Sequence, residues 1–201
     1  YTLPSIDGLE ERWGASVFHC PFCHGWEHRD QPLGMLGGPA ERALLLRRWT
    51  NDLTLITHGT DLTDEEVERL EARGIRIVDG EVVSLDGPGR DIAYVTLADD
   101  TRLPLRGLMV AAPHRFRQPQ LFSSLDLAIT PSGHIRVDEV GATSVAGVWA
   151  VGDLTSPMAS VARAIAAGST AAAAITHDLV AASWPTQVTA NGHRRPDTSQ
   201  R

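Results

Sequence analysis

Hydrophobic residues in the first half of the chain alternate between strand-like runs and a helix-like segment. Apolar runs at residues 31–36 and 53–57 predict short buried strands, and residues 40–49 between them are helix formers with three consecutive leucines. The first run ends at Gly37 and Gly38, which predict a tight turn. These segments form a strand, turn, helix and strand, which is the start of a parallel sheet of the dinucleotide-binding type.

A second helix is predicted from a capping signal. Residues 63–66 read Thr-Asp-Glu-Glu, in which the first and last side chains each cap the backbone of the other. We expect this helix to continue to residue 73, with Val67 and Leu70 facing inward, and to end at Gly74. Residues 75–78 then supply a third strand.

The spacing of apolar residues changes to every second position after residue 81. Residues 82–85, 92–97 and 102–105 have this alternation, and the Gly-Pro-Gly and Asp-Asp sequences between them are turn formers. We therefore expect a three-stranded antiparallel meander, followed by another buried strand at residues 108–112.

The last third of the chain combines an apolar segment with a long helix. Residues 147–151 have no polar side chain and predict a strand that brings Gly152 and Asp153 to its carboxyl end, where open α/β sheets bind ligands. Ser156 and Pro157 are a favourable N-cap and first-turn pair for a helix that is expected to continue to about residue 180.

The predicted fold class is therefore α/β. A Rossmann-like parallel sheet and the antiparallel meander form one domain of the pyridine-nucleotide type, and a second, smaller domain follows. The expected organisation is a linker at residues 1–13, the first domain at 14–112, the second at 113–183 and a polar tail at 184–201.

Composition places the chain among globular proteins. Hydrophobic residues make up 42% and charged residues 21% of its 201 positions. The net charge of −7 argues against nucleic acid as the main partner, because phosphate binding needs a clustered basic surface. The small-residue run at 159–182 is interrupted by Arg163, His177 and Asp178, so we expect it to be too polar to span a bilayer. Two cysteines exclude a disulfide scaffold and favour a reducing compartment such as the cytoplasm.

Both cysteines belong to one motif, Cys20-Pro-Phe-Cys23, which His24 follows directly. Two thiols at this spacing can close a small disulfide, and a thiolate at the start of a helix is reactive near neutral pH. The motif therefore favours redox chemistry. Two alternatives remain, namely half of a zinc site, although the chain has no second pair of cysteines, or two inert thiols.

The cysteine motif ahead of a βαβ unit, the meander, and the segment from Thr143 to Asp153 together resemble the thioredoxin reductase family of flavoprotein disulfide oxidoreductases. The resemblance implies FAD as cofactor, a dithiol or disulfide substrate that is a protein such as thioredoxin or a small molecule, and a homodimer when full length. It also implies that the cysteines lie in a domain inserted between two halves of an FAD domain, and that the chain ends with the C-terminal half of that FAD domain.

The resemblance assigns roles to individual residues. Cys23 is expected to contact the flavin and Cys20 to exchange with the substrate. Asp153 is expected to hold the ribityl chain of FAD, and Gly152 to let the cofactor approach. No counterpart of the first FAD half, with its glycine-rich phosphate loop, precedes the cysteines, so we expect a complete relative to have a further small domain ahead of Tyr1.

His24 departs from the family pattern, which has an acidic residue after the second cysteine. The Cys-His-Gly sequence with Glu27 resembles the branch of dithiol oxidases that close disulfides in natural products such as gliotoxin and holomycin and pass electrons to oxygen. His24 is therefore a candidate general acid and base for the thiols, because imidazole titrates near neutral pH. The alternative is a polar residue at a helix start that faces solvent.

The nucleotide-binding turn also departs from the family pattern. The Gly-x-Gly-x-x-Ala positions of the reductases are Leu36, Gly38 and Glu41 here, so a glutamate replaces the small residue next to the pyrophosphate. Residues 58–64 stand at the NADP signature and contain no arginine. Gly37 and Gly38 remain candidate cofactor-binding residues, but NADPH is expected to be a poor reductant, and NADH meets the same crowded turn.

Three hypotheses follow for the function. The first is an FAD-dependent disulfide oxidoreductase that exchanges electrons between flavin, the cysteine pair and an external thiol or disulfide. The second is an oxygen-linked dithiol oxidase on the same scaffold. The third is a non-enzymatic fragment that keeps the fold and the cysteines but binds no flavin. No metal site is predicted.

Overall fold

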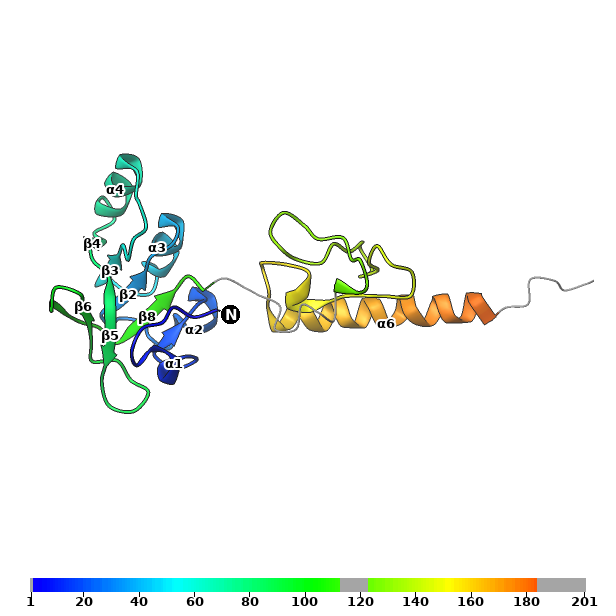
Figure 1. Ribbon diagram of the computed structural model, residues 1–201, viewed down its shortest axis with the longest axis horizontal. Helices are drawn as coiled ribbons and strands as arrows, with labels where there is room; N and C mark the ends of the chain where they lie inside the picture. The colour runs from blue at the N-terminus through cyan, green and yellow to red at the C-terminus, as the bar shows by residue number, and fades with distance from the viewer. Residues whose placement is uncertain (1, 113–122, 184–201) are drawn as a thin grey trace, which may run out of the picture. The chain divides into compact units, whose positions relative to one another are not determined.

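The computed structural model describes residues 2–112 and 123–183. The chain divides into two compact units, Tyr1–Arg115 and Phe116–Arg201, each with its own secondary structure (Figure 1). The predicted tail at residues 184–201 lies outside the described residues.

A five-stranded parallel sheet forms the centre of the first unit, in the order β1-β8-β2-β3-β4. Strand β2 pairs with both neighbours along its whole length, so that Leu36 lies beside Ile56 of β3 and Val110 of β8. The strands are β1 (Val17–Phe18), β2 (Leu33–Leu36), β3 (Leu53–Ile56), β4 (Arg76–Val78) and β8 (Gly107–Val110). The predicted parallel sheet of this α/β fold is therefore confirmed.

Helices α3 (Ala40–Leu46) and α4 (Asp64–Glu71) pack against one face of this sheet. Helix α4 begins with the predicted capping box. Thr63 Oγ1 accepts a hydrogen bond from the Glu66 N–H at 3.3 Å, and the Glu66 carboxylate accepts one from the Thr63 N–H at 2.9 Å. Leu70 is fully buried as expected, whereas Val67 is only half-buried.

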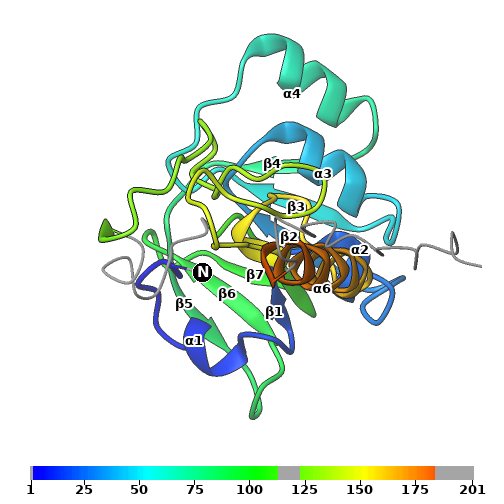
Figure 2. The ribbon, with the colours of Figure 1, turned by 90° about the vertical axis from the view of Figure 1, so that its right-hand side faces the viewer.

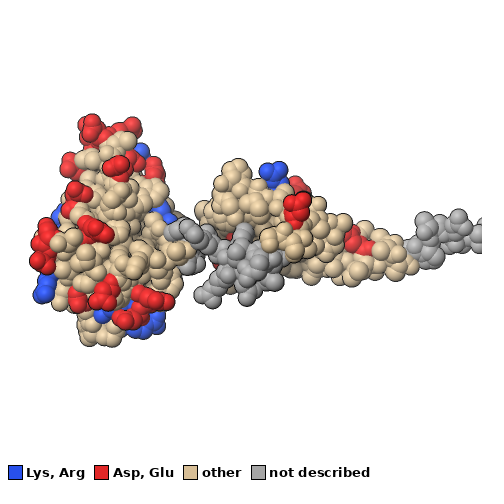
Figure 3. All heavy atoms as spheres, viewed as in Figure 1, with Lys and Arg blue, Asp and Glu red and all other residues tan. Residues whose placement is uncertain are grey.

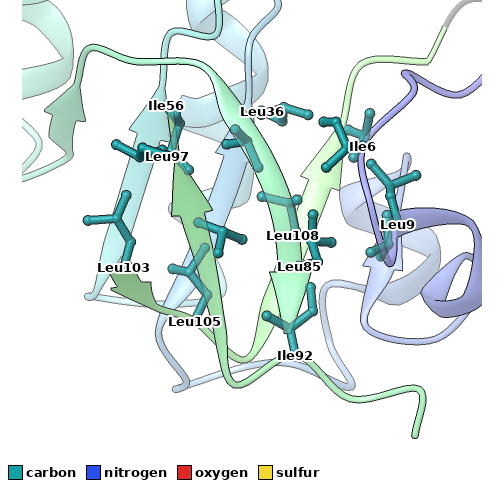
Figure 4. Packing of buried hydrophobic residues seen from close by; sticks show 14 of the residues in the cluster. Ile6, Leu9, Leu36, Ile56, Leu85, Ile92, Leu97, Leu103, Leu105 and Leu108 are labelled. Atoms are coloured by element: carbon teal, nitrogen blue, oxygen red, sulfur yellow. The ribbon is translucent and has the colours of Figure 1, made fainter. Parts of the chain in front are cut away.

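The antiparallel meander covers the opposite face of the parallel sheet. Its strands are β5 (Val82–Asp86), β6 (Tyr94–Leu97) and β7 (Arg102–Pro104), paired in that order. Leu97 and Leu103 of the meander share one buried cluster with Leu36 and Ile56 of the parallel sheet (Figure 4). The first unit therefore has three layers, which are helices, parallel sheet and meander (Figure 2).

Side chains of β2 alternate between the two cores of this unit. Leu33 and Met35 belong to the cluster with α3 and α4, and Leu36 belongs to the cluster with the meander. Gly34 faces the meander side, where a Cβ atom would come within 2.6 Å of Leu105 Cδ1. The run is apolar throughout because both faces of this sheet are covered.

The segment at residues 1–13, which the sequence assigns to a linker, packs onto the first unit in its described part. It contains the short helix α1 (Leu9–Arg12), and Ile6 and Leu9 are buried in the same cluster as the meander residues (Figure 4). Isolated apolar residues in a short segment produce no helix or strand periodicity, so the pattern alone cannot reveal this packing.

Arg12 ties this segment to the meander. Its guanidinium group is buried and donates hydrogen bonds to the carbonyl oxygens of Gly8 at 2.8 Å, Gly87 at 2.9 Å and Asp91 at 3.3 Å. Gly87 and Asp91 belong to the connection between β5 and β6, so a single side chain joins two segments that are distant in sequence.

The second unit contains the short 3-10 helix η1 (Gly152–Leu154) and the long helix α6 (Val161–Ser183). The predicted strand at residues 147–151 is wrong. Within the described part of this unit, Trp149 makes an isolated bridge to Ala142, and the segment belongs to no strand. A strand needs a continuous ladder of hydrogen bonds to a neighbour, and an apolar sequence does not supply that neighbour.

Helix α6 begins later than predicted. Its first residue is Val161, and Ser160 Oγ accepts a hydrogen bond from the Arg163 N–H at 3.3 Å. Ser156, the predicted N-cap, instead accepts a hydrogen bond from the Met158 N–H at 3.1 Å in the turn before the helix. The helix extends through Ser183, the last described residue, and so includes the predicted end near residue 180.

Most of α6 is exposed within its unit. Val161, Ile165 and Leu179 expose 78%, 68% and 66% of their surface. The side of α6 that is seen in Figure 3 carries few charged side chains. With a mean hydropathy of 1.2, α6 has the length and composition of a membrane-crossing helix, which differs from the expectation that this run is too polar. One such helix is weak evidence for a membrane, because apolar helices of soluble proteins meet the same criteria.

Candidate active site

Cys20 and Cys23 are joined by a disulfide at the start of α2 (Pro21–His24). Cys20 is the N-cap residue with an extended backbone, and the fixed φ of Pro21 favours the first helical turn. The Cys20 carbonyl oxygen accepts hydrogen bonds from the N–H groups of Cys23 and His24, both at 3.3 Å. This turn brings the two cysteine Cα atoms to 5.3 Å, within the range that disulfides require.

The disulfide residues are accessible in the first unit. Cys23 is exposed and Cys20 is half-buried. In the disulfide neither sulfur is a thiolate, which is the form that binds zinc, and residues 2–112 and 123–183 contain no cluster of three or more His, Cys, Asp or Glu side chains that would hold a metal. The chemistry open to this arrangement is attack on the S–S bond by an external thiolate.

His24 packs against Phe18 and does not face solvent freely. The two rings are stacked with centroids 6.0 Å apart and planes at 22°, and His24 is half-buried. Its Nδ1 atom is buried with no hydrogen-bond partner among the described residues. Buried polar atoms usually have a partner, so this nitrogen is a candidate to exchange a proton with a reacting group beside Cys23.

Gly25 lets α2 pack directly against Trp49. A Cβ atom at Gly25 would lie 2.4 Å from Trp49 Cδ1 and 2.3 Å from the Pro21 carbonyl oxygen. Trp26 meets Trp49 edge to face with ring centroids 5.8 Å apart, and Arg29 stacks over Trp26 at 4.1 Å. Sequence reasoning missed Trp49, because a residue that is distant along the chain has no spacing relation to the motif.

Two further contacts hold the segment ahead of the cysteines. Arg42 of α3 donates a hydrogen bond to the His19 carbonyl oxygen, and the His19 ring stacks on Trp13 with centroids 5.8 Å apart. Phe22, between the cysteines, exposes 69% of its surface, and Trp26 exposes 57%. The cysteine pair is therefore anchored to α3 and bordered by exposed aromatic side chains.

The candidate nucleotide residues lie at the turn between β2 and α3. Gly37 and Gly38 have left-handed backbones, with φ of 55° and 84°, which explains why both positions are glycine. Pro39 is the N-cap of α3, and Glu41 lies in its first turn. The turn is thus where the sequence predicts it, with a proline and a carboxylate at its helical end.

Gly152 and Asp153 belong to the second unit, at η1. Gly152 has a φ of 74°, which favours glycine, and a Cβ atom there would meet Ala164 Cβ at an ordinary 3.6 Å. Asp153 is exposed, and its carboxylate accepts no hydrogen bond from the residues that the structure describes. The side chain is therefore available to an external donor.

Comparison with known proteins places the chain in a family. The sequence profile of the pyridine nucleotide-disulphide oxidoreductases matches residues 2–169. The chain belongs to this family. Among its members, the thioredoxin reductase of Gibberella zeae is 28% identical over 218 residues, covering 89% of this chain and 62% of that protein. The thioredoxin reductase sirT of Leptosphaeria maculans is 26% identical over 198 residues, covering 90% of this chain and 60% of that protein.

Solved structures of family members have the same fold. The crystal structure of HlmI is 40% identical, with a TM-score of 0.83 over 89% of this chain and 57% of HlmI. The putative thioredoxin reductase TrxB of Bacillus anthracis is 28% identical, with a TM-score of 0.82 over 91% of this chain and 63% of TrxB. The predicted thioredoxin reductase-like fold is therefore confirmed, and the chain spans less than two thirds of the length of these relatives.

Proposed function

We propose that this chain is the disulfide-bearing part of an FAD-dependent thiol–disulfide oxidoreductase. The observation that carries the proposal is the Cys20–Cys23 disulfide at the start of α2, with Cys23 exposed and His24 beside it. Membership of the pyridine nucleotide-disulphide oxidoreductases supports an oxidoreductase of the thioredoxin reductase type. The proposed external partner is a dithiol or disulfide, either in a protein such as thioredoxin or in a small molecule.

In the oxidative direction, a substrate thiolate attacks one sulfur of the Cys20–Cys23 bond. That bond breaks, a mixed disulfide forms, and the other cysteine leaves as a thiolate. The second substrate thiol then displaces the attached cysteine, so the substrate gains a disulfide and the chain holds two thiols. Two electrons and two protons pass from the substrate to the cysteine pair, and the reverse steps reduce a disulfide substrate.

The residues around the pair are proposed to have distinct roles. Cys20 exchanges with the substrate and Cys23 faces the flavin, as the family resemblance implies. His24 accepts and returns the thiol protons, because its Nδ1 has no partner among the described residues and stacking on Phe18 fixes its ring.

FAD, when bound, supplies the two-electron acceptor or donor for the cysteine pair. The Asp153 carboxylate fits part of its site, because an exposed carboxylate without a described donor can accept hydrogen bonds from ribityl hydroxyls. The pyrophosphate needs backbone N–H donors at a helix N-terminus. We propose that these donors belong to the part of the relatives' length that this chain does not span, and that the same part covers the exposed apolar side chains of α6.

An oxygen-linked dithiol oxidase on the same scaffold is the second candidate. It is favoured by His24 beside the cysteine pair and by Glu41 at the nucleotide turn, which opposes a bound pyrophosphate. A substrate dithiol then delivers the electrons, and oxygen takes up two electrons and two protons to become hydrogen peroxide. For either reaction we propose a cytoplasmic homodimer as the working form of the full-length protein.

The test uses the full-length parent protein, purified with its flavin and mixed anaerobically with excess dithiothreitol in a stopped-flow spectrophotometer. We expect the flavin absorbance to bleach in the wild-type protein and to stay oxidised on the same timescale in the Cys20→Ser and Cys23→Ser variants. A colourless parent protein, or flavin that is reduced equally well in both variants, would overturn the proposal.

Mixing the same protein with NADPH distinguishes the two candidates. Bleaching within milliseconds at micromolar NADPH supports the reductase. Bleaching by the dithiol, slow or no bleaching by NADPH, and reoxidation by air support the oxidase.

A further inference from the structure

The turn between β2 and α3 already has a hydrogen-bond acceptor from within the chain. The Gly38 N–H donates to Thr60 Oγ1 at 3.1 Å. Thr60 follows β3, and its own N–H donates to the Thr57 carbonyl oxygen at 2.8 Å, which holds the backbone that carries this hydroxyl. In dinucleotide-binding turns, backbone N–H groups at this place bind the pyrophosphate.

The space that the glycines leave open is also filled by the protein. A Cβ atom at Gly37 would lie 2.9 Å from Thr60 Oγ1 and 3.3 Å from the Thr57 carbonyl oxygen. A Cβ atom at Gly38 would lie 2.7 Å from Ala111 Cβ, just after β8. Glycines in a dinucleotide-binding turn normally allow the pyrophosphate to approach the backbone. Here side chains of two other segments, Thr60 and Ala111, fill the space beside the glycine Cα atoms.

The helical end of the turn adds two features that oppose a phosphate. Pro39 has no N–H to donate, and the Glu41 carboxylate lies in the first turn of α3. A carboxylate there is stabilised by the helix N-terminus and repels a second anion. No lysine or arginine occurs from residue 53 to residue 68. Arg42, which follows Glu41 in α3, donates a hydrogen bond to the His19 carbonyl oxygen.

We propose that Thr60 is a specificity-determining residue that closes the turn against NADH and NADPH. Its hydroxyl supplies the hydrogen-bond acceptor that a pyrophosphate would otherwise supply, and its position fills the approach to Gly37. The two glycines then serve the geometry of the turn alone. The inference concerns binding to the first unit and is independent of the flavin and of the cysteines, so its failure is distinguishable from failure of the proposed function.

The test compares three substitutions at one position in the whole 201-residue chain. Thr60→Ser keeps the hydroxyl, Thr60→Val keeps the volume without the acceptor, and Thr60→Gly removes both. Hydrogen exchange of the Gly38 amide is measured by NMR relative to amides of β6, which report global stability. We expect unchanged relative exchange in Thr60→Ser and exchange faster by about fivefold or more in Thr60→Val.

Titration with NADH provides the second measurement. We expect the wild-type chain and Thr60→Ser to bind NADH with a Kd of about 1 mM or weaker. The double variant Thr60→Gly with Glu41→Ala is expected to have a Kd for NADH that is at least about tenfold lower. Glu41→Ala alone is the matched control and is expected to show no such gain, because the Thr60 hydroxyl still holds the Gly38 amide.

Several outcomes would overturn the proposal. They are micromolar binding of NADH or NADPH to the wild-type chain, equal relative exchange of the Gly38 amide in the Ser and Val variants, and an equal gain in binding from Glu41→Ala alone. If a Thr60 variant does not fold, measurements on the wild-type chain still test the proposal. A slowly exchanging Gly38 amide without NADH binding supports a closed turn, and micromolar binding contradicts it.

Discussion

Replacing Gly25 by alanine tests how strongly the redox turn depends on its contact with Trp49. The backbone of Gly25 is right-handed helical, with φ of −61° and ψ of −32°, so alanine introduces no backbone strain and the effect is steric. The new Cβ atom would lie 2.4 Å from Trp49 Cδ1, 2.6 Å from Trp49 Nε1 and 2.3 Å from the Pro21 carbonyl oxygen, all below the 3.0 Å that real Cβ contacts respect. The Pro21 oxygen belongs to the backbone, so α2 itself must shift.

The expected cost follows from these contacts. Overpacking by one methyl group costs about 1–3 kcal/mol, and the preference of a helix for alanine over glycine returns up to about 1 kcal/mol. These terms leave about 0–3 kcal/mol, and because the backbone oxygen of Pro21 must shift we expect Gly25→Ala to lower the free energy of unfolding by about 1–2 kcal/mol. Urea denaturation followed by tryptophan fluorescence measures it, because Trp26 and Trp49 lie at the substitution.

Gly168→Ala in α6 is the matched control. It is the same substitution within a helix, but a Cβ atom there meets nothing within 4 Å, so we expect unchanged or slightly increased stability by circular dichroism. A free energy of unfolding for Gly25→Ala within about 0.5 kcal/mol of the wild-type value would refute the steric argument.

Thiol counting is expected to find no free thiol in air and two free thiols, those of Cys20 and Cys23, after mild reduction. Two free thiols in air together with stoichiometric bound zinc would contradict the redox assignment. Gel filtration of the isolated 201-residue chain with FAD is expected to remove the flavin, because the pyrophosphate donors are proposed to lie elsewhere in the parent; stoichiometric flavin in the eluted chain would refute this. Arg12→Met is expected to lower the free energy of unfolding by about 2–4 kcal/mol in urea denaturation, since it leaves the partly buried carbonyl oxygens of Gly8 and Gly87 without the guanidinium donor; a loss near zero would show that water replaces the guanidinium. The pKa of Glu66 is lowered, first by the hydrogen bond from the Thr63 backbone N–H and then by the one from the Thr63 side chain. Ionised Glu66 therefore stabilises the folded chain fully above the usual glutamate pKa, and this contribution is lost as the pH falls through the lowered pKa. The stability advantage of the wild-type chain over Glu66→Gln is therefore expected to shrink in acid, and an advantage that does not change with pH would contradict the assignment.

The sequence by itself determined the elements whose signals are local. The capping box at Thr63 depends on side chains one helical turn apart, and the structure forms both of its hydrogen bonds. The apolar run of β2 indicates a strand that is covered on both faces, and the alternating apolar residues of the meander indicate strands that are covered on one face. The spacing of apolar residues along the chain is enough to predict both. In the candidate active site, Cys20, Cys23 and His24 lie within one short motif, so the motif alone could nominate them.

Only the tertiary structure decided which distant residues meet. The contact of Gly25 with Trp49 and the hydrogen bond from Gly38 to Thr60 join positions with no spacing relation, and nothing in the local sequence marks them. The apolar segment at residues 147–151 shows the converse, since it has the composition of a strand but no ladder within the described residues. Periodicity specifies that a side chain will be covered, whereas the partner that covers it is chosen by the packing of the whole chain.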